Sequence, residues 1–184
     1  MIKIAMIAGS NRRNASSTLL LRHIGDRLAA RNIRAELIDL HRLPLPLYSP
    51  DAGDADPNVR ILLEAVREAD GLILATPEYH GSVSGVLKNA LDYIEISHVS
   101  GKPVLVASSS GGPVGVSSLT HLQSIVRNLH GVNCPEWISI GGEFRRFGPD
   151  GAPADEKTRE RVERAVDRFV ALTLALRSDR QVEA

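Results

Sequence analysis

Short, almost wholly apolar runs alternate along this chain with longer amphipathic segments, and this alternation limits the possible folds more than any other feature. Four of the runs are nearly all apolar, as parallel strands buried on both faces require. These runs are Ile2–Ala8, Gly71–Ala75, Pro103–Ser108 and Trp137–Ile140. A fifth run, Ile33–Asp39, alternates more between polar and apolar residues and suits a strand nearer the sheet edge. The sequence therefore predicts five strands.

The segments between these runs place apolar residues at helical spacing. The predicted helices cover Ser17–Arg31, Asn58–Glu68, Val83–Ile96, Ser117–His130 and a last segment from about Asp155. Strands that alternate with helices of this length imply right-handed crossovers and a parallel sheet with helices on both faces. Five strands fit the flavodoxin-like order 2-1-3-4-5 better than a six-stranded dinucleotide-binding fold. We therefore expect one α/β domain over residues 1–177 and a polar tail over residues 178–184.

Composition and charge restrict the class of function. Apolar residues make up 43% of the 184 residues and charged residues 24%, which is ordinary for a globular domain. The 22 basic residues balance the 22 acidic ones. A protein that binds nucleic acid by neutralising phosphates is normally basic, and many small electron carriers are strongly acidic. The neutral balance therefore favours a small-molecule partner and argues against nucleic acid.

Cysteine and histidine usage points to neither secretion nor a metal site. Cys134 is the only cysteine, so no intramolecular disulfide can form. The apolar run at the N-terminus is too short for a signal peptide or a membrane span. The six histidines show none of the usual metal-ligand spacings. We expect a cytoplasmic protein with no bound metal and no membrane association.

The first predicted strand is followed by a hydroxyl-rich turn that leads into a helix, with the sequence Gly-Ser-Asn-Arg-Arg-Asn-Ala-Ser-Ser-Thr over residues 9–18. Free N–H groups and the helix dipole favour an anion at such a position, and Arg12 can pair with a phosphate. The alternative is an ordinary turn in which Ser16 or Ser17 merely caps the helix. Neither the P-loop pattern nor the glycine pattern of dinucleotide-binding folds is present.

Two further loops follow the third and fourth predicted strands. The third strand leads into Thr-Pro-Glu-Tyr-His-Gly-Ser over residues 76–82, where Tyr79 is placed to stack on a flat ring. The alternative is that Tyr79 and His80 are surface turn residues. The fourth strand leads into Ser-Ser-Ser-Gly-Gly-Pro over residues 108–113, where two glycines allow a ligand to approach the backbone closely. A flexible turn without a ligand is the alternative there.

Taken together, these three loops resemble the NADPH-dependent FMN reductase family of flavodoxin-like proteins. The most specific part is Pro-Glu-Tyr-His-Gly-Ser-Val-Ser-Gly-Val-Leu-Lys-Asn-Ala-Leu-Asp over residues 77–92, and Leu-Pro-Leu-Pro-Leu-Tyr over residues 43–48 is also similar. The resemblance implies noncovalent FMN and NADPH or NADH as co-substrate. Hydride would pass to flavin N5 and on to a quinone, azo compound, flavin or metal ion. No catalytic side chain is then demanded, because the cofactor supplies the chemistry.

The resemblance also implies the residues that hold FMN. The phosphate would bind Ser10, Arg12, Ser16 and Ser17. The sequence leaves open which of Ser16 and Ser17 is the main ligand. The ring and ribityl chain would meet Pro77, Glu78, Tyr79 and His80, and the pyrimidine side would meet Ser109, Gly111 and Gly112. The chain departs from many relatives at residues 13–15, where they have Lys-Gly-Ser, and at His80, where they have asparagine.

Two further predictions concern the assembly of the protein and the rival function of electron transfer. Lys88 and Asp92 are spaced as a helical ion pair, for which we favour a structural or subunit-interface role over catalysis. The family resemblance and the apolar breadth of the helices over 83–96 and 117–130 favour a homodimer or homotetramer. The rival function is a flavodoxin-type FMN carrier that serves a protein partner, and the neutral charge and Arg12 weigh against it.

Overall fold

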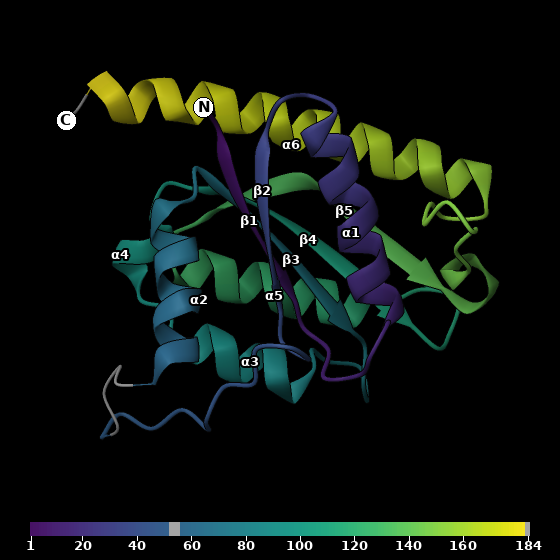
Figure 1. Ribbon diagram of the computed structural model, residues 1–184, viewed down its shortest axis with the longest axis horizontal. Coiled ribbons are helices and arrows are strands. Elements are labelled where there is room, and N and C mark those ends of the chain that lie inside the picture. The colour runs from purple at the N-terminus through teal and green to yellow at the C-terminus, as the bar shows by residue number, and fades with distance from the viewer. Residues whose placement is uncertain (52–55, 183–184) are drawn as a thin grey trace.

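A five-stranded parallel sheet forms the middle layer of the protein, in a computed structural model that describes residues 1–51 and 56–182 (Figure 1). Its strands are β1 (Lys3–Ala8), β2 (Arg34–Asp39), β3 (Gly71–Pro77), β4 (Pro103–Ser110) and β5 (Val132–Gly141). The spatial order is β2-β1-β3-β4-β5, and every neighbouring pair is parallel. The predicted flavodoxin-like order 2-1-3-4-5 is confirmed, and the carboxyl ends of the strands lie along one edge of the sheet.

Helices cover both faces of the sheet (Figure 1). They are α1 (Ser16–Ala29), α2 (Pro57–Glu68), α3 (Gly85–Asp92), α4 (Ile96–Val99), α5 (Val116–Asn128) and α6 (Glu156–Val182), together with the 3-10 helix η1 (Gly142–Arg145). The helices α1 and α6 pack on one face, and α2 to α5 pack on the other. The side chains of β3 alternate between the two cores, since Leu72 and Leu74 face one and Ile73 faces the other. This double burial is the physical reason for the continuous apolar runs.

Two elements differ from the sequence prediction. The helix predicted over Val83–Ile96 is shorter and spans Gly85–Asp92, and the separate short helix α4 begins at Ile96. The Ser84 hydroxyl accepts a hydrogen bond from the Leu87 N–H at 3.2 Å, which sets the start of α3. The strand predicted over Trp137–Ile140 spans Val132–Gly141 instead. Trp137 is 39% exposed rather than buried, because β5 lies at the edge of the sheet.

The last helix, α6, packs across β4 and β5 and reaches α1. It continues through Val182, so most of the segment predicted as a polar tail is helical, as arginine and glutamine favour. Residues 183 and 184 lie outside the described part of the chain.

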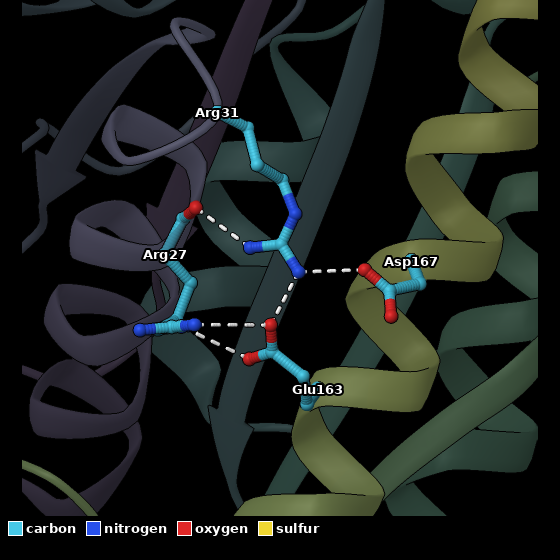
Figure 2. A network of polar contacts seen from close by, with 4 residues as sticks. All are labelled: Arg27, Arg31, Glu163 and Asp167. Carbon is cyan, nitrogen blue, oxygen red and sulfur yellow. Dashed lines mark hydrogen bonds and ion pairs between the residues drawn. The ribbon is translucent and has the colours of Figure 1, made fainter.

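An ion-pair network joins α1 to α6 (Figure 2). Arg27 Nε donates to Glu163 at 3.0 Å, and Arg31 donates both to Glu163 and, at 2.6 Å, to Asp167. Burial alone would raise the pKa of Glu163, but the hydrogen bonds from Arg27 and Arg31 outweigh it and hold that pKa below its usual value. The network thus links the C-terminal end of α1, and the turn that follows it, to α6.

Candidate functional site

The loops that follow β1, β3, β4 and β5 meet at the carboxyl edge of the sheet and enclose a small pocket of about 80 Å³. The residues that line it are Ser10, Arg12, Ala15, Ser16, Ser17, Pro77, Glu78, Tyr79, Ser109, Gly111 and Arg145. All the site residues predicted from the sequence are in this lining except His80 and Gly112. Ala15 and Arg145 also line the pocket and were not predicted. Ligands of open parallel sheets bind at this edge.

The N-terminus of α1 supplies hydrogen-bond donors that the protein itself does not use. The residue at the cap position is Ala15, which has no side-chain oxygen, and no side chain among the described residues caps the helix. The alternative that Ser16 or Ser17 caps α1 is therefore wrong. The first N–H groups of a helix have no partner inside it. These groups are consequently available to an anion in the pocket.

Two buried hydroxyl groups lie beside these donors. Ser17 and Thr18 are each 1% exposed, and within the described residues neither Ser17 Oγ nor Thr18 Oγ1 has a hydrogen-bond partner. Buried side-chain oxygens are rarely left without a partner, and leaving one so costs about 1–3 kcal/mol. A bound phosphate would supply the missing acceptor for Ser17, which lines the pocket.

The turn between β1 and α1 is braced by its neighbours. Ser10 Oγ accepts a hydrogen bond from the Arg12 N–H at 3.2 Å, and the backbone oxygen of Asn11 lies 2.8 Å from His41 Nδ1. A side chain at Gly9 would place its Cβ 2.6 Å from the Cβ of Leu87, so only glycine lets α3 approach the turn this closely. The turn is therefore shaped by the protein before any ligand binds.

The loop after β3 forms a tight hairpin turn. Tyr79 and Ser82 exchange two backbone hydrogen bonds of 3.0 Å, and His80 and Gly81 between them have φ values of 51° and 72°. Turns of this kind need positive φ at both central positions, where histidine, like asparagine, is tolerated. This explains the histidine at the position where many relatives have asparagine. His80 itself is exposed and does not line the pocket, whereas Tyr79 lines it and is 51% exposed.

Glu78 holds this loop against α5. Its carboxylate accepts a hydrogen bond at 2.9 Å from the Ser118 N–H in the first turn of α5, and its own N–H donates to the backbone oxygen of Ser109 at 2.9 Å. Ser82 Oγ and His121 Nδ1 lie 2.9 Å apart and form a second link to the same helix. The family resemblance implied that Glu78 meets the flavin ring; in the structure its carboxylate binds the first turn of α5.

The glycines after β4 leave space at the pocket. A Cβ added at Gly111 or Gly112 would meet nothing within 4 Å, and neither residue has a positive φ. The fold itself therefore does not require glycine at these positions, and the open space is available to a ligand. Gly115 is different, because a Cβ there would lie 2.2 Å from Ser108 Oγ.

The Lys-Asn-Ala-Leu-Asp segment of α3 has a structural role. The Asn89 side chain donates to the backbone oxygen of Pro46 and accepts from the N–H of Tyr48, both at 2.8 Å. Lys88 and Asp92 form an exposed ion pair of 2.5 Å. Asn89 thus anchors the loop that follows β2, which is a contact that residue spacing alone did not reveal.

The lone thiol is not part of this pocket, and no metal-binding cluster is found among the described residues. Burial raises the pKa of Cys134 to about 11, so its thiol stays protonated at neutral pH. The described residues contain no group of three or more His, Cys, Asp or Glu side chains that could hold a metal ion. None of the helices in that part of the chain is long and apolar enough to cross a membrane.

Several larger hollows lie away from this edge of the sheet. One, of about 510 Å³, is formed by β5 and α6, and another, of about 520 Å³, is lined by α1, α6 and the loop before α6. Their linings are rich in charged side chains that pair with each other, such as Arg27 with Glu163 and Arg168 with Glu136. The small pocket is the stronger candidate because its donors lack such partners.

Comparison with known proteins shows which proteins this chain resembles over most of its length. The sequence pattern of the NADPH-dependent FMN reductase family matches residues 2–144. An FMN-dependent NADPH-azoreductase of Staphylococcus aureus is 38% identical over 156 residues, which cover 82% of this chain and 83% of that protein.

Solved structures of similar proteins extend the likeness over nearly the whole chain. The flavoenzyme FerB of Paracoccus denitrificans, an NAD(P)H:(acceptor) oxidoreductase, has a TM-score of 0.79 and 26% identity and covers 95% of this chain and 98% of its own. The NADH:FMN oxidoreductase EMOB has a TM-score of 0.72 and 25% identity and covers 95% of this chain and 90% of its own. A flavodoxin from the domain Archaea shares the fold, with a TM-score of 0.64 at 13% identity.

Proposed function

Since this chain belongs to the NADPH-dependent FMN reductase family, we propose that it is an FMN-dependent oxidoreductase that takes hydride from NADPH and passes it to a small acceptor. The observation that carries the proposal is the N-terminus of α1, where Ser17 is buried, lines the pocket and has no partner among the described residues. A terminal phosphate such as that of FMN fits this end of the pocket in charge and in hydrogen bonding.

The residues of the pocket divide the work of holding FMN. Ser10, Ser17 and the first N–H groups of α1 hold the phosphate, and Arg12 neutralises part of its charge. Of the two serines left open by the sequence, Ser17 is the main ligand, because its hydroxyl is buried and has no partner among the described residues. The phosphate end is small, so the ring lies outside it over the loops after β3 and β4.

The loops that follow β3 and β4 orient the flavin ring. Tyr79 lies at the half-exposed margin of the pocket, where an aromatic ring covers part of the flavin and leaves one face open. The backbone at Gly111 approaches the pyrimidine side, where N–H donors stabilise negative charge. Bound FMN supplies the atom that accepts and releases hydride, so no side chain has to do so.

The acceptor is a small molecule that enters over the same open face. The similarity to an azoreductase favours azo compounds, and quinones suit the same exposed ring. The test is steady-state NADPH oxidation by the FMN-loaded chain with an azo dye or a quinone, repeated with NADH. A chain that binds FMN and yet oxidises neither nucleotide would favour the rival function of an electron carrier.

We propose a homodimer or homotetramer that assembles through α3 and α5. A groove of about 400 Å³ between these helices is lined by Leu91, Ile94, Ile125 and Leu129, with Lys88 and Asp92 among the polar residues of the lining. Light scattering at micromolar concentration tests this, and a monomer would refute it. A cytoplasmic location remains a proposal that rests on the single cysteine.

A further inference from the structure

Arg145 lines the pocket from the end of the edge strand β5. It is the last residue of η1, which follows the edge strand β5, yet its side chain lines the pocket together with Arg12 and Ser17. The family pattern ends at residue 144, directly before this position. The arginine is therefore a part of the site that neither the sequence motifs nor the family match indicated.

The start of η1 lies against the loop that follows β4. A side chain at Gly141 would bring its Cβ within 2.4 Å of the backbone oxygens of Gly112 and Pro113, so η1 begins in close contact with the loop after β4. The chain beyond η1 then returns toward α1, where Asp150 borders the same hollow as His23. Arg145 is thus positioned by the close packing of the start of η1 against the loop after β4.

The guanidinium groups of Arg145 and Arg12 are both available to a ligand. Arg145 Nε donates to the backbone oxygen of Gly142 at 3.3 Å, and within the described residues its terminal nitrogens bind no acidic group. The side chain of Arg12 likewise has no partner in the described part of the chain. Glu78, the acidic residue in the pocket lining, accepts a hydrogen bond from α5.

The charge of this cluster matches that of a terminal phosphate. A phosphate monoester carries roughly −1.5 to −2 charges at neutral pH. The N-terminus of α1 supplies about half a positive charge and one arginine a full charge, which falls short of the upper end of that range, and a second arginine makes up the difference. The pocket volume of about 80 Å³ suits a group of this size rather than a flavin ring.

We propose that Arg145 is a second phosphate-binding cation, which donates from its terminal nitrogens to the FMN phosphate opposite Arg12. The site then selects a terminal phosphate monoester, and so distinguishes FMN from riboflavin, which lacks the phosphate. This assignment rests on the proposed function, because it takes FMN to be the ligand.

The test compares FMN and riboflavin binding to the full-length chain freed of bound flavin, by quenching of flavin fluorescence. We expect Arg145→Ala to weaken FMN binding by about 10- to 100-fold, which corresponds to a hydrogen bond to a charged group. Riboflavin binding should change by less than about twofold, within the ordinary effect of a surface substitution. Arg145→Lys, which keeps the charge, should restore part of the loss.

Arg146→Ala is the matched control, because this neighbouring arginine is exposed and does not line the pocket. It should leave the affinities for both flavins unchanged. Thermal unfolding of each variant without flavin shows whether the fold is kept. Higher ionic strength should reduce the difference between wild type and Arg145→Ala for FMN alone.

Three results would overturn the assignment. Unchanged FMN affinity in Arg145→Ala would show that Arg145 does not bind the phosphate. Equal losses for FMN and riboflavin would show that Arg145 supports the loop or the ring instead. A wild-type chain that binds neither flavin would overturn the proposed function as well. The titration of the wild-type chain alone distinguishes this result from the other two.

Discussion

The two ends of the pocket differ in how their polar groups are satisfied. At the phosphate end, the N-terminus of α1 is uncapped and the hydroxyls of Ser17 and Thr18 lack partners among the described residues. At the ring end, Glu78 and Ser82 are already bonded to α5, and the hairpin turn closes on itself. The protein thus builds the ring end by itself and leaves the phosphate end to be completed by a ligand. Substitutions at the phosphate end should therefore act on FMN binding alone, and those at the ring end also on the fold or on the reaction.

The largest expected effect is at Arg12. We expect Arg12→Ala to weaken FMN binding by about 1.5–3 kcal/mol, because it removes a hydrogen bond between two charged groups. Fluorescence titration measures this. Arg13→Ala is the control, since Arg13 is exposed and outside the pocket lining. Equal affinities of Arg12→Ala and wild type would contradict the placement of the phosphate.

Ser17→Ala separates binding from stability most directly. The free energy of unfolding of the flavin-free chain should stay the same or rise, because a buried hydroxyl without a partner is removed. FMN binding should weaken by about 1.5 kcal/mol. Urea unfolding and flavin titration on the same preparation check both. A clear loss of stability without flavin would mean that Ser17 has a structural partner after all.

Tyr79→Ala tests the ring end through the reaction. Loss of stacking should weaken FMN binding by up to about 1.5 kcal/mol and slow hydride transfer, since small displacements of the reacting atoms carry large rate losses. Stability should hardly change, because the side chain is half-exposed. Stopped-flow reduction of the FMN-saturated variant by NADPH is the measurement. Wild-type affinity and wild-type rate together would show that Tyr79 is only a turn residue.

Glu78→Ala should give the smallest effect, and it should appear without flavin. Removing the acceptor for the Ser118 N–H should lower the free energy of unfolding by about 1 kcal/mol, as loss of a helix cap does. Glu78→Gln keeps an oxygen acceptor and should recover most of that loss. Urea unfolding of the flavin-free chain measures both variants. A larger effect on FMN affinity than on stability would reverse the contrast between the two ends.

Much of this site follows from local sequence. The turn over residues 9–18, the Pro-Glu-Tyr-His turn and the two glycines after β4 were all predicted, because hydroxyls, glycines and prolines at the ends of apolar runs have local structural consequences. His80 fits for the same reason, since its backbone conformation is set by the turn. The sequence could not show that His80 and Gly112 stay outside the pocket lining.

The sequence by itself determined the five strands, their parallel order and the turn between β1 and α1, since burial on both faces and the start of a helix leave local patterns. Only the tertiary structure decided that Glu78 binds α5, that Trp137 is partly exposed and that Arg145 reaches the pocket. Each of these depends on contacts between segments far apart in the chain. Arg145 and Arg146 are adjacent residues of the same type, and only the packing of η1 against the loop after β4 places one of them in the pocket and leaves the other outside its lining.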